Sequence, residues 1–142
     1  MIEYAISACL CGKNVRYDGR SKEFAVCRKL VEEGKAIMIC PEVMGGMSIP
    51  RNPCEIKDGR VVDNTGKDQT EYFLKGCKEV EAILEKYPTI HTLIIKEGSP
   101  SCGSHRIYDG TFSGTCIPGK GMLLRNLKKE LRVLNEEELD KI

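Results

Sequence analysis

The 142 residues, with 41% apolar and 30% charged side chains, predict one domain over residues 1–142 whose core needs no disulfide scaffold. The 22 basic and 21 acidic residues leave a formal net charge of +1. The chain therefore has no excess of positive charge that would attract a large nucleic acid or an anionic membrane. No apolar run approaches the roughly 18 residues of a membrane span, and the N-terminus lacks the segments of a signal peptide, so we expect a cytoplasmic protein.

The first third of the chain predicts two short buried strands with a helix between them. Residues 4–8 form an apolar run typical of a strand that ends at Cys9, and residues 36–39 form a second run that ends at Cys40. Between them, Ser21 is the predicted N-cap of a helix that Gly34 closes. Residues 41–53 contain prolines and a glycine pair that exclude a continuous helix.

The rest of the chain continues the alternation of strands and helices. Residues 54–63 predict a β-hairpin with its turn at Asp58-Gly59. A capping box at residues 68–71 predicts the start of a long helix, which Pro88 ends. Residues 92–95 predict a third buried strand, residues 122–127 a further helix, and residues 131–134 a final strand.

Short, uniformly apolar strands alternating with helices indicate a parallel sheet covered on both faces. The predicted fold class is therefore α/β: a single three-layer Rossmann-like domain with a short, mainly parallel sheet and a small β-hairpin insertion.

Eight cysteines are the unusual feature of the composition. They make up about 5.6% of the chain, below the roughly 8–10% of a small disulfide scaffold. In the absence of a secretory signal, metal binding or catalysis is the better expectation than disulfide formation.

Three of these cysteines follow the predicted strands. Cys9 and Cys40 come directly after the first two strands, and Cys102 lies in the loop after the third. Because the carboxyl ends of parallel strands share one edge, we expect the three thiols to meet in one pocket.

Three thiolates together need a metal or a cluster. The close pairs of a zinc ribbon are absent, whereas an iron–sulfur cluster with three cysteine ligands would leave one iron open to substrate.

The other cysteines receive different interpretations. Cys27 and Cys77 fall on apolar helix faces, where packing in the core is the expected role. Cys54 and Cys116 lie in segments without a clear partner, and their roles stay open. Cys11, two residues after Cys9, is open as a fourth ligand, a redox partner or neither.

Polar residues near the three thiols suggest further chemistry. Glu42 is a candidate general acid or base, and Ser99 and Ser101 are candidate hydrogen-bond donors to substrate or water. Arginine offers a planar fork of N–H groups to a heterocycle or an anion, and the candidates for that role are Arg16, Arg51 and Arg106.

Three segments of the chain resemble the motifs of the thiouracil desulfidase (TudS-like) family. They are Ile6-Ser7-Ala8-Cys9-Leu10-Cys11-Gly12 with residues 15–19, Cys40-Pro41-Glu42-Val43-Met44-Gly45-Gly46 with residues 50–53, and residues 96–103 with residues 107–112. The resemblance implies an iron–sulfur enzyme that removes sulfur from a small thiolated nucleobase or nucleoside, with a 4Fe–4S cluster held by Cys9, Cys40 and Cys102. It also implies proton transfer by Glu42 with Ser99 or Ser101 during attack of water on the thiolated carbon.

Two other functions stay open at this point. A non-catalytic iron–sulfur or sulfur carrier would keep the three thiols but has little use for Glu42 and the Ser99–Ser101 segment. A structural zinc protein is the third alternative. The net charge disfavours large RNA as a partner, and the sequence does not indicate the oligomeric state.

Overall fold

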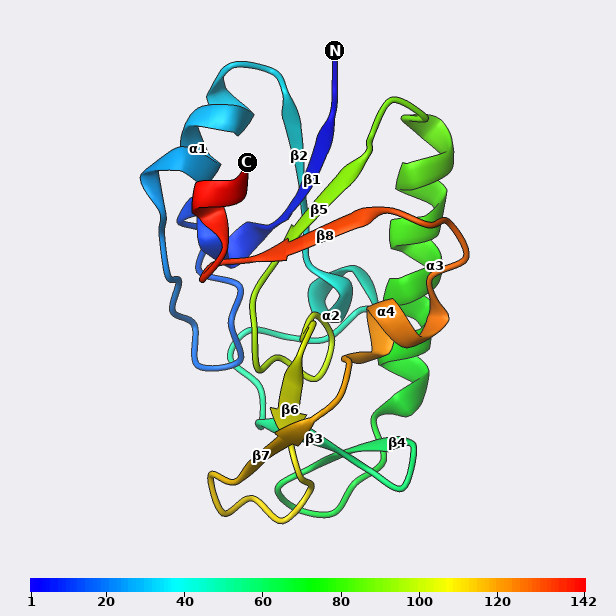
Figure 1. Cartoon of the computed structure of the whole chain (residues 1–142). Coiled ribbons are helices and arrows are strands. Elements are labelled where there is room, and N and C mark those ends of the chain that lie inside the picture. The colour runs from blue at the N-terminus through cyan, green and yellow to red at the C-terminus, as the bar shows by residue number, and fades with distance from the viewer.

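The computed structural model describes residues 1–142 and is built around a four-stranded parallel sheet (Figure 1). The strands are β1 (Tyr4–Ser7), β2 (Ala36–Ile39), β5 (Thr92–Ile95) and β8 (Arg132–Asn135), in the spatial order β2-β1-β5-β8. The four predicted strands are therefore confirmed. The chain leaves β1 toward β2 and later returns on the other side of β1 to form β5, so a topological switch point lies at the carboxyl end of β1.

Alternating side chains of the strands face two separate cores. Ala5 and Leu93 belong to the larger core, whereas Ile6 and Ile94 belong to the smaller one. The larger core packs against α3 (Thr70–Lys86) and α4 (Met122–Asn126), and the smaller core against α1 (Ala25–Glu32) and the 3-10 helix η1 (Ala8–Cys11). Figure 1 shows α1 on one side of the sheet and α3 with α4 on the other. This arrangement confirms the three-layer α/β prediction.

Two helix starts differ from the sequence prediction. The first helix begins at Ala25 after Phe24, not after Ser21. The predicted capping box of α3 does not form, because Asp68 accepts the N–H of Thr70, the first helical residue, and the N-cap position falls to Gln69. The buried face of α3 includes Phe73, Cys77, Val80 and Leu84, so Cys77 lies on the apolar face as predicted.

A short helix, α2 (Pro41–Met44), lies in the segment predicted only as turns. Pro41 is at its start, where the missing N–H is not needed. The helix crosses α3 at two glycines: a Cβ on Gly76 would lie 1.8 Å from the carbonyl oxygen of Pro41, and one on Gly45 would lie 2.0 Å from that of Tyr72. The backbones of α2 and α3 are therefore in direct contact, and this contact fixes the position of Pro41 and its neighbours against α3.

Two hairpins lie beyond the carboxyl ends of the sheet strands (Figure 1). The predicted one joins β3 (Cys54–Lys57) to β4 (Arg60–Asp63), and its turn residues Asp58 and Gly59 have φ of 51° and 77°, as a tight hairpin turn requires. The second joins β6 (Arg106–Tyr108) to β7 (Cys116–Pro118) and was not predicted. The chain ends in the 3-10 helix η2 (Leu139–Lys141), and none of the helices has the length and apolar character of a membrane span.

Candidate active site

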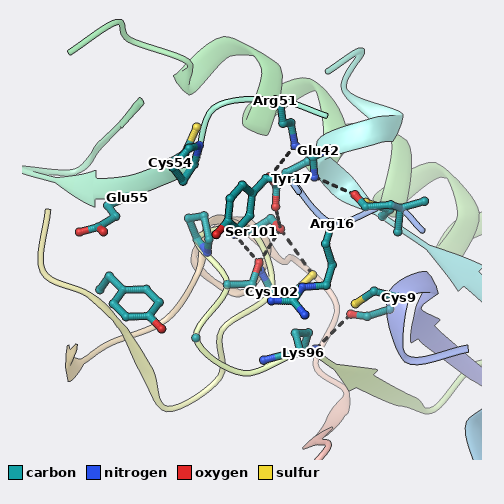
Figure 2. A pocket seen from close by; sticks show the side chains of 18 of the residues that line it. Cys9, Arg16, Tyr17, Glu42, Arg51, Cys54, Glu55, Lys96, Ser101 and Cys102 are labelled. Atoms are coloured by element: carbon teal, nitrogen blue, oxygen red, sulfur yellow. Dashed lines mark hydrogen bonds and ion pairs between the residues drawn. The ribbon is translucent and has the colours of Figure 1, made fainter. Parts of the chain in front are cut away.

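A cavity of about 550 Å³ lies where the carboxyl ends of β1, β2 and β5 face the two hairpins. Its size falls in the range of small-molecule sites. All six residues predicted as site residues line it, namely Cys9, Cys40, Glu42, Ser99, Ser101 and Cys102. Figure 2 labels Cys9, Glu42, Ser101 and Cys102 among them.

The three predicted cysteines reach the cavity from three different strand ends. Cys9 lies in η1 directly after β1, Cys40 precedes α2 after β2, and Cys102 lies in the loop after β5. Cys9 and Cys102 are buried, and Cys40 is half-buried. Burial is the main cause of the raised pKa of Cys9 and of Cys102, and charge on a neighbouring thiol adds to it, from Cys40 on Cys9 and from both on Cys102. The three sulfurs therefore share one site although 31 and 62 residues separate them in sequence.

Burial opposes ionisation of all three thiols. It raises the pKa of Cys9 to about 11, against the partial compensation from Lys96 and Arg16. Burial likewise raises the pKa of Cys102 and of Cys40; for Cys40, the backbone N–H groups of Val43 and Glu42 offset part of the effect. Thiolates at such positions need a cationic partner, and a metal centre deprotonates coordinating thiols.

Glu42 lies beside the thiols as a fixed carboxylate. Its Oε1 accepts a hydrogen bond of 3.1 Å from Nε of Arg51, and the two side chains are 12% and 6% exposed. Arg51 also donates to the carbonyl oxygens of Ser48 and Val15. This buried ion pair, together with the hydrogen bonds of Arg51 to the backbone, fixes the position of the Glu42 carboxyl group at the cavity wall.

The two serines differ in their hydrogen bonds. Oγ of Ser99 accepts the backbone N–H groups of Ser101 and Cys102, at 3.1 Å each, so its own proton is directed at Oγ of Ser101, 2.9 Å away. Ser101 in turn donates to Oε2 of Glu42 at 2.7 Å. Ser101 is thus the serine in contact with the carboxylate, and Ser99 shapes the loop behind it.

The loop that carries the serines is anchored by a second buried carboxylate, Glu97. Its oxygens accept the backbone N–H groups of Gly98, Ser104, His105 and Arg106 and the side-chain donors of Ser104 and Asn135. Burial alone would raise the pKa of Glu97, but these hydrogen bonds lower it to about 2. Glu97 was not predicted as a site residue, because nothing in the sequence shows that the N–H groups of residues 104–106 converge on it.

The hairpins provide the outer wall of the cavity. Glu55 in β3 is buried, and its Oε1 accepts the N–H groups of Gly110 (2.9 Å) and Phe112 (3.1 Å). These contacts attach the loop between β6 and β7 to β3 and bring Phe112, with an unusual φ of 56°, to the cavity wall. The site role of Glu55 was also missed, because the second hairpin was not predicted.

The remaining cysteines do not form a second site. Cys11 is buried with Cys27 in the smaller core and does not line the cavity, which argues against its role as a fourth ligand. Cys77 is a core residue of α3 as predicted, and Cys116 is exposed. Cys54 does line the cavity, across from Cys9 in Figure 2, and burial raises the pKa of its thiol to about 12.

The donor set fits an iron–sulfur cluster better than a single metal ion. Nowhere in the chain do three Cys, His, Asp or Glu side chains lie close enough together to surround one ion, as a structural zinc site requires. A cluster takes each thiolate on a different iron, so its ligands stand farther apart. Cys9, Cys40 and Cys102 line one cavity and offer the thiolate chemistry that such a cluster takes, with one ligand fewer than the usual four.

Comparisons with known proteins show what the whole chain is similar to. The family model described as 2-thiouracil desulfurase matches residues 4–138. The protein YbbK of Bacillus subtilis (strain 168) is 41% identical over 148 aligned positions, which cover 96% of this chain and 97% of YbbK. The solved structure of the 4Fe–4S-dependent thiouracil desulfidase TudS is similar with a TM-score of 0.92 and 38% identity, over 99% of this chain and 95% of that one.

Proposed function

The chain belongs to the 2-thiouracil desulfurase family, and from this premise we propose that it is a 4Fe–4S-dependent desulfidase that removes sulfur from a small thiolated pyrimidine base or nucleoside. The observation that supports the proposal most directly is the convergence of three thiols and the Ser101–Glu42 pair on one cavity. A carrier protein would need the thiols alone.

Cys9, Cys40 and Cys102 are the proposed cluster ligands. When bound, such a cluster would supply an iron without a protein ligand, a soft Lewis acid for the sulfur of the substrate. The thiols would lose their protons on ligation, which removes the cost that burial places on their ionisation.

Glu42 and Ser101 are the proposed proton-transfer residues. Arg51 holds the carboxyl group of Glu42 in place through an ion pair, and Ser101 already donates a hydrogen bond to it. A water molecule next to Ser101 would pass a proton to Glu42 through this hydroxyl while its oxygen attacks the thiolated carbon. Glu42 would then return this proton to the sulfur as the C–S bond breaks, and the second proton of the water is released as the C=O bond forms, so that the products are the oxo base, hydrosulfide and one proton.

The test is anaerobic purification and iron–sulfur reconstitution followed by incubation with 2-thiouracil. We expect about four iron and four sulfide per chain, release of sulfide and formation of uracil. Cys40→Ser should lose both iron and turnover, whereas Cys116→Ser, at an exposed thiol outside the cavity, should lose neither. Iron-free wild-type protein after reconstitution would refute the proposal, and a full cluster without turnover of any thiolated base would favour the carrier.

The two serines provide a sharper test of the proton path. Ser101→Ala removes the hydroxyl that contacts Glu42, so we expect kcat to fall roughly 100-fold or more with iron content unchanged. Ser99→Ala should reduce kcat less, because that hydroxyl only supports Ser101 and the loop. A larger loss for Ser99→Ala than for Ser101→Ala would contradict this assignment.

A further inference from the structure

One cation that lines the cavity has no partner within the chain. The cations of the cavity wall are Arg16, Arg51 and Lys96. Arg51 is fully engaged with Glu42 and two carbonyl oxygens. Lys96 forms an ion pair of 2.9 Å with Glu136 and donates to the carbonyl oxygen of Glu97. The half-buried guanidinium of Arg16 makes no hydrogen bond or ion pair with any residue.

The backbone on both sides of Arg16 is anchored. Nη2 of Arg51 donates to the carbonyl oxygen of Val15 at 2.9 Å, and the carbonyl oxygen of Tyr17 accepts the backbone N–H of Arg51 at 2.8 Å. The turn is closed by backbone hydrogen bonds from Arg16 to Arg20 and from Gly19 to Arg16. Arg16 is therefore presented to the cavity by a fixed loop, and the residue that fixes the loop is the same one that orients Glu42.

The guanidinium points toward the region where the proposed reaction takes place. Figure 2 shows the side chain of Arg16 reaching toward Cys9 and Cys102, and all three residues line the cavity. A thiolated pyrimidine with its sulfur toward the cysteines and its thiolated carbon toward Ser101 would contact this side chain with the rest of its ring.

On the basis of the proposed function, we infer that Arg16 is a substrate-positioning residue whose guanidinium binds the exocyclic oxygen of the base, such as the 4-oxygen of 2-thiouracil. A planar fork of N–H donors matches the edge of a planar ring better than a point charge does. A site built to donate hydrogen bonds to a substrate group discriminates strongly against an analogue without that group. The inferred preference is for thiolated pyrimidines with an oxo group over thiones without one.

The test is the binding of reaction products to the anaerobically reconstituted protein, which needs no turnover. Uracil and pyrimidin-2-one are compared by equilibrium dialysis, since the second lacks the oxygen at position 4 and, with it, the proton on N3. The wild type should bind uracil roughly 10- to 100-fold more tightly, the range of one hydrogen bond to a charged group. Arg16→Gln should bring the two affinities within about threefold, and Arg16→Lys should restore part of the difference. The matched control is Arg106→Gln, because Arg106 is paired with Glu137 outside the cavity.

Kinetics and iron content distinguish the possible failures. With 2-thiouracil, Arg16→Gln should raise KM more than it lowers kcat, at unchanged iron content. An undiminished preference for uracil in Arg16→Gln would overturn the inference, and so would loss of iron, which would make Arg16 a counter-charge for the cluster. Failure of the wild type to bind uracil would overturn it as well. A wild type that contains no iron or releases no sulfide would instead refute the proposed function itself.

Discussion

The carboxylate of Glu97 is 2% exposed and accepts hydrogen bonds from four backbone N–H groups and two side chains. Its pKa of about 2 lies below the usual 4.5 because hydrogen bonds to the ionised form outweigh the effect of burial. A carboxyl group with a depressed pKa in the folded state stabilises the protein fully above its unfolded pKa and loses that effect as the pH falls toward the folded pKa.

The acid sensitivity of the protein should therefore depend on Glu97. Between about pH 4.5 and pH 2, protonation of Glu97 should remove roughly 3 kcal/mol from the free energy of unfolding. Glu97→Gln should lower stability at pH 7 and show a shallower loss between pH 5 and pH 2, measured by urea denaturation. Glu130→Gln, at an exposed glutamate, is the control and should behave as wild type. Equal pH slopes for wild type and Glu97→Gln would contradict this role.

The sequence was most informative for residues at the ends of strands. The positions of Cys9, Cys40 and Cys102 in one cavity could be predicted, because parallel topology alone brings strand ends together. The partner of Glu42 could not be predicted, because three arginines were equivalent in the sequence and only the folded chain shows that Arg51 is the one that reaches it. The sequence also did not distinguish Ser99 from Ser101, since their difference lies in which backbone N–H groups point at each hydroxyl.

At the scale of elements, strong local patterns were predicted well and tertiary contacts were not. The four strands, the β3–β4 hairpin and α3 follow from apolar periodicity and turn residues. Helix α2 was missed because four residues carry no periodicity and its stability comes from packing on α3. The β6–β7 hairpin was missed because its three-residue strands enclose a long loop of small polar residues, and Glu55 supplies contacts from elsewhere in the chain.

The crossing of α2 and α3 leads to a prediction for Gly76. A Cβ at this position would lie 1.8 Å from the carbonyl oxygen of Pro41, so Gly76→Ala must move α2 away from α3. We expect a loss of about 2 kcal/mol or more in the free energy of unfolding, in the range for overpacked sites, together with reduced iron retention because Cys40 precedes α2. Thermal denaturation and iron analysis are the measurements, and Lys75→Ala at the adjacent exposed position is the control. An unchanged free energy of unfolding in Gly76→Ala would show that α2 can move away from α3 without destabilising the protein.

At the scale of the whole molecule, the proposed cluster would connect the ends of three strands and so should stabilise the complete fold. A ligand that binds only the folded state raises the free energy of unfolding by mass action. The increase is about 2.7 kcal/mol when the free ligand concentration is a hundred times its Kd. We expect anaerobic reconstitution to raise Tm by roughly 5–10 °C and iron chelation to reverse the rise. Cys9→Ser and Cys102→Ser should show no such rise, whereas Cys11→Ala should keep it. A rise of equal size in Cys9→Ser would argue against Cys9 as a ligand.

The parallel order β2-β1-β5-β8 has a consequence for how the protein is made. Strand β1 precedes its partner β5 by about 90 residues, and β8 follows β5 by about another 40. During synthesis, Cys9 and Cys40 therefore emerge long before the loop with Cys102 exists. The complete set of thiols exists only after Cys102 has left the ribosome, so insertion of the proposed cluster has to wait for it and depends on how long the early thiols stay reduced.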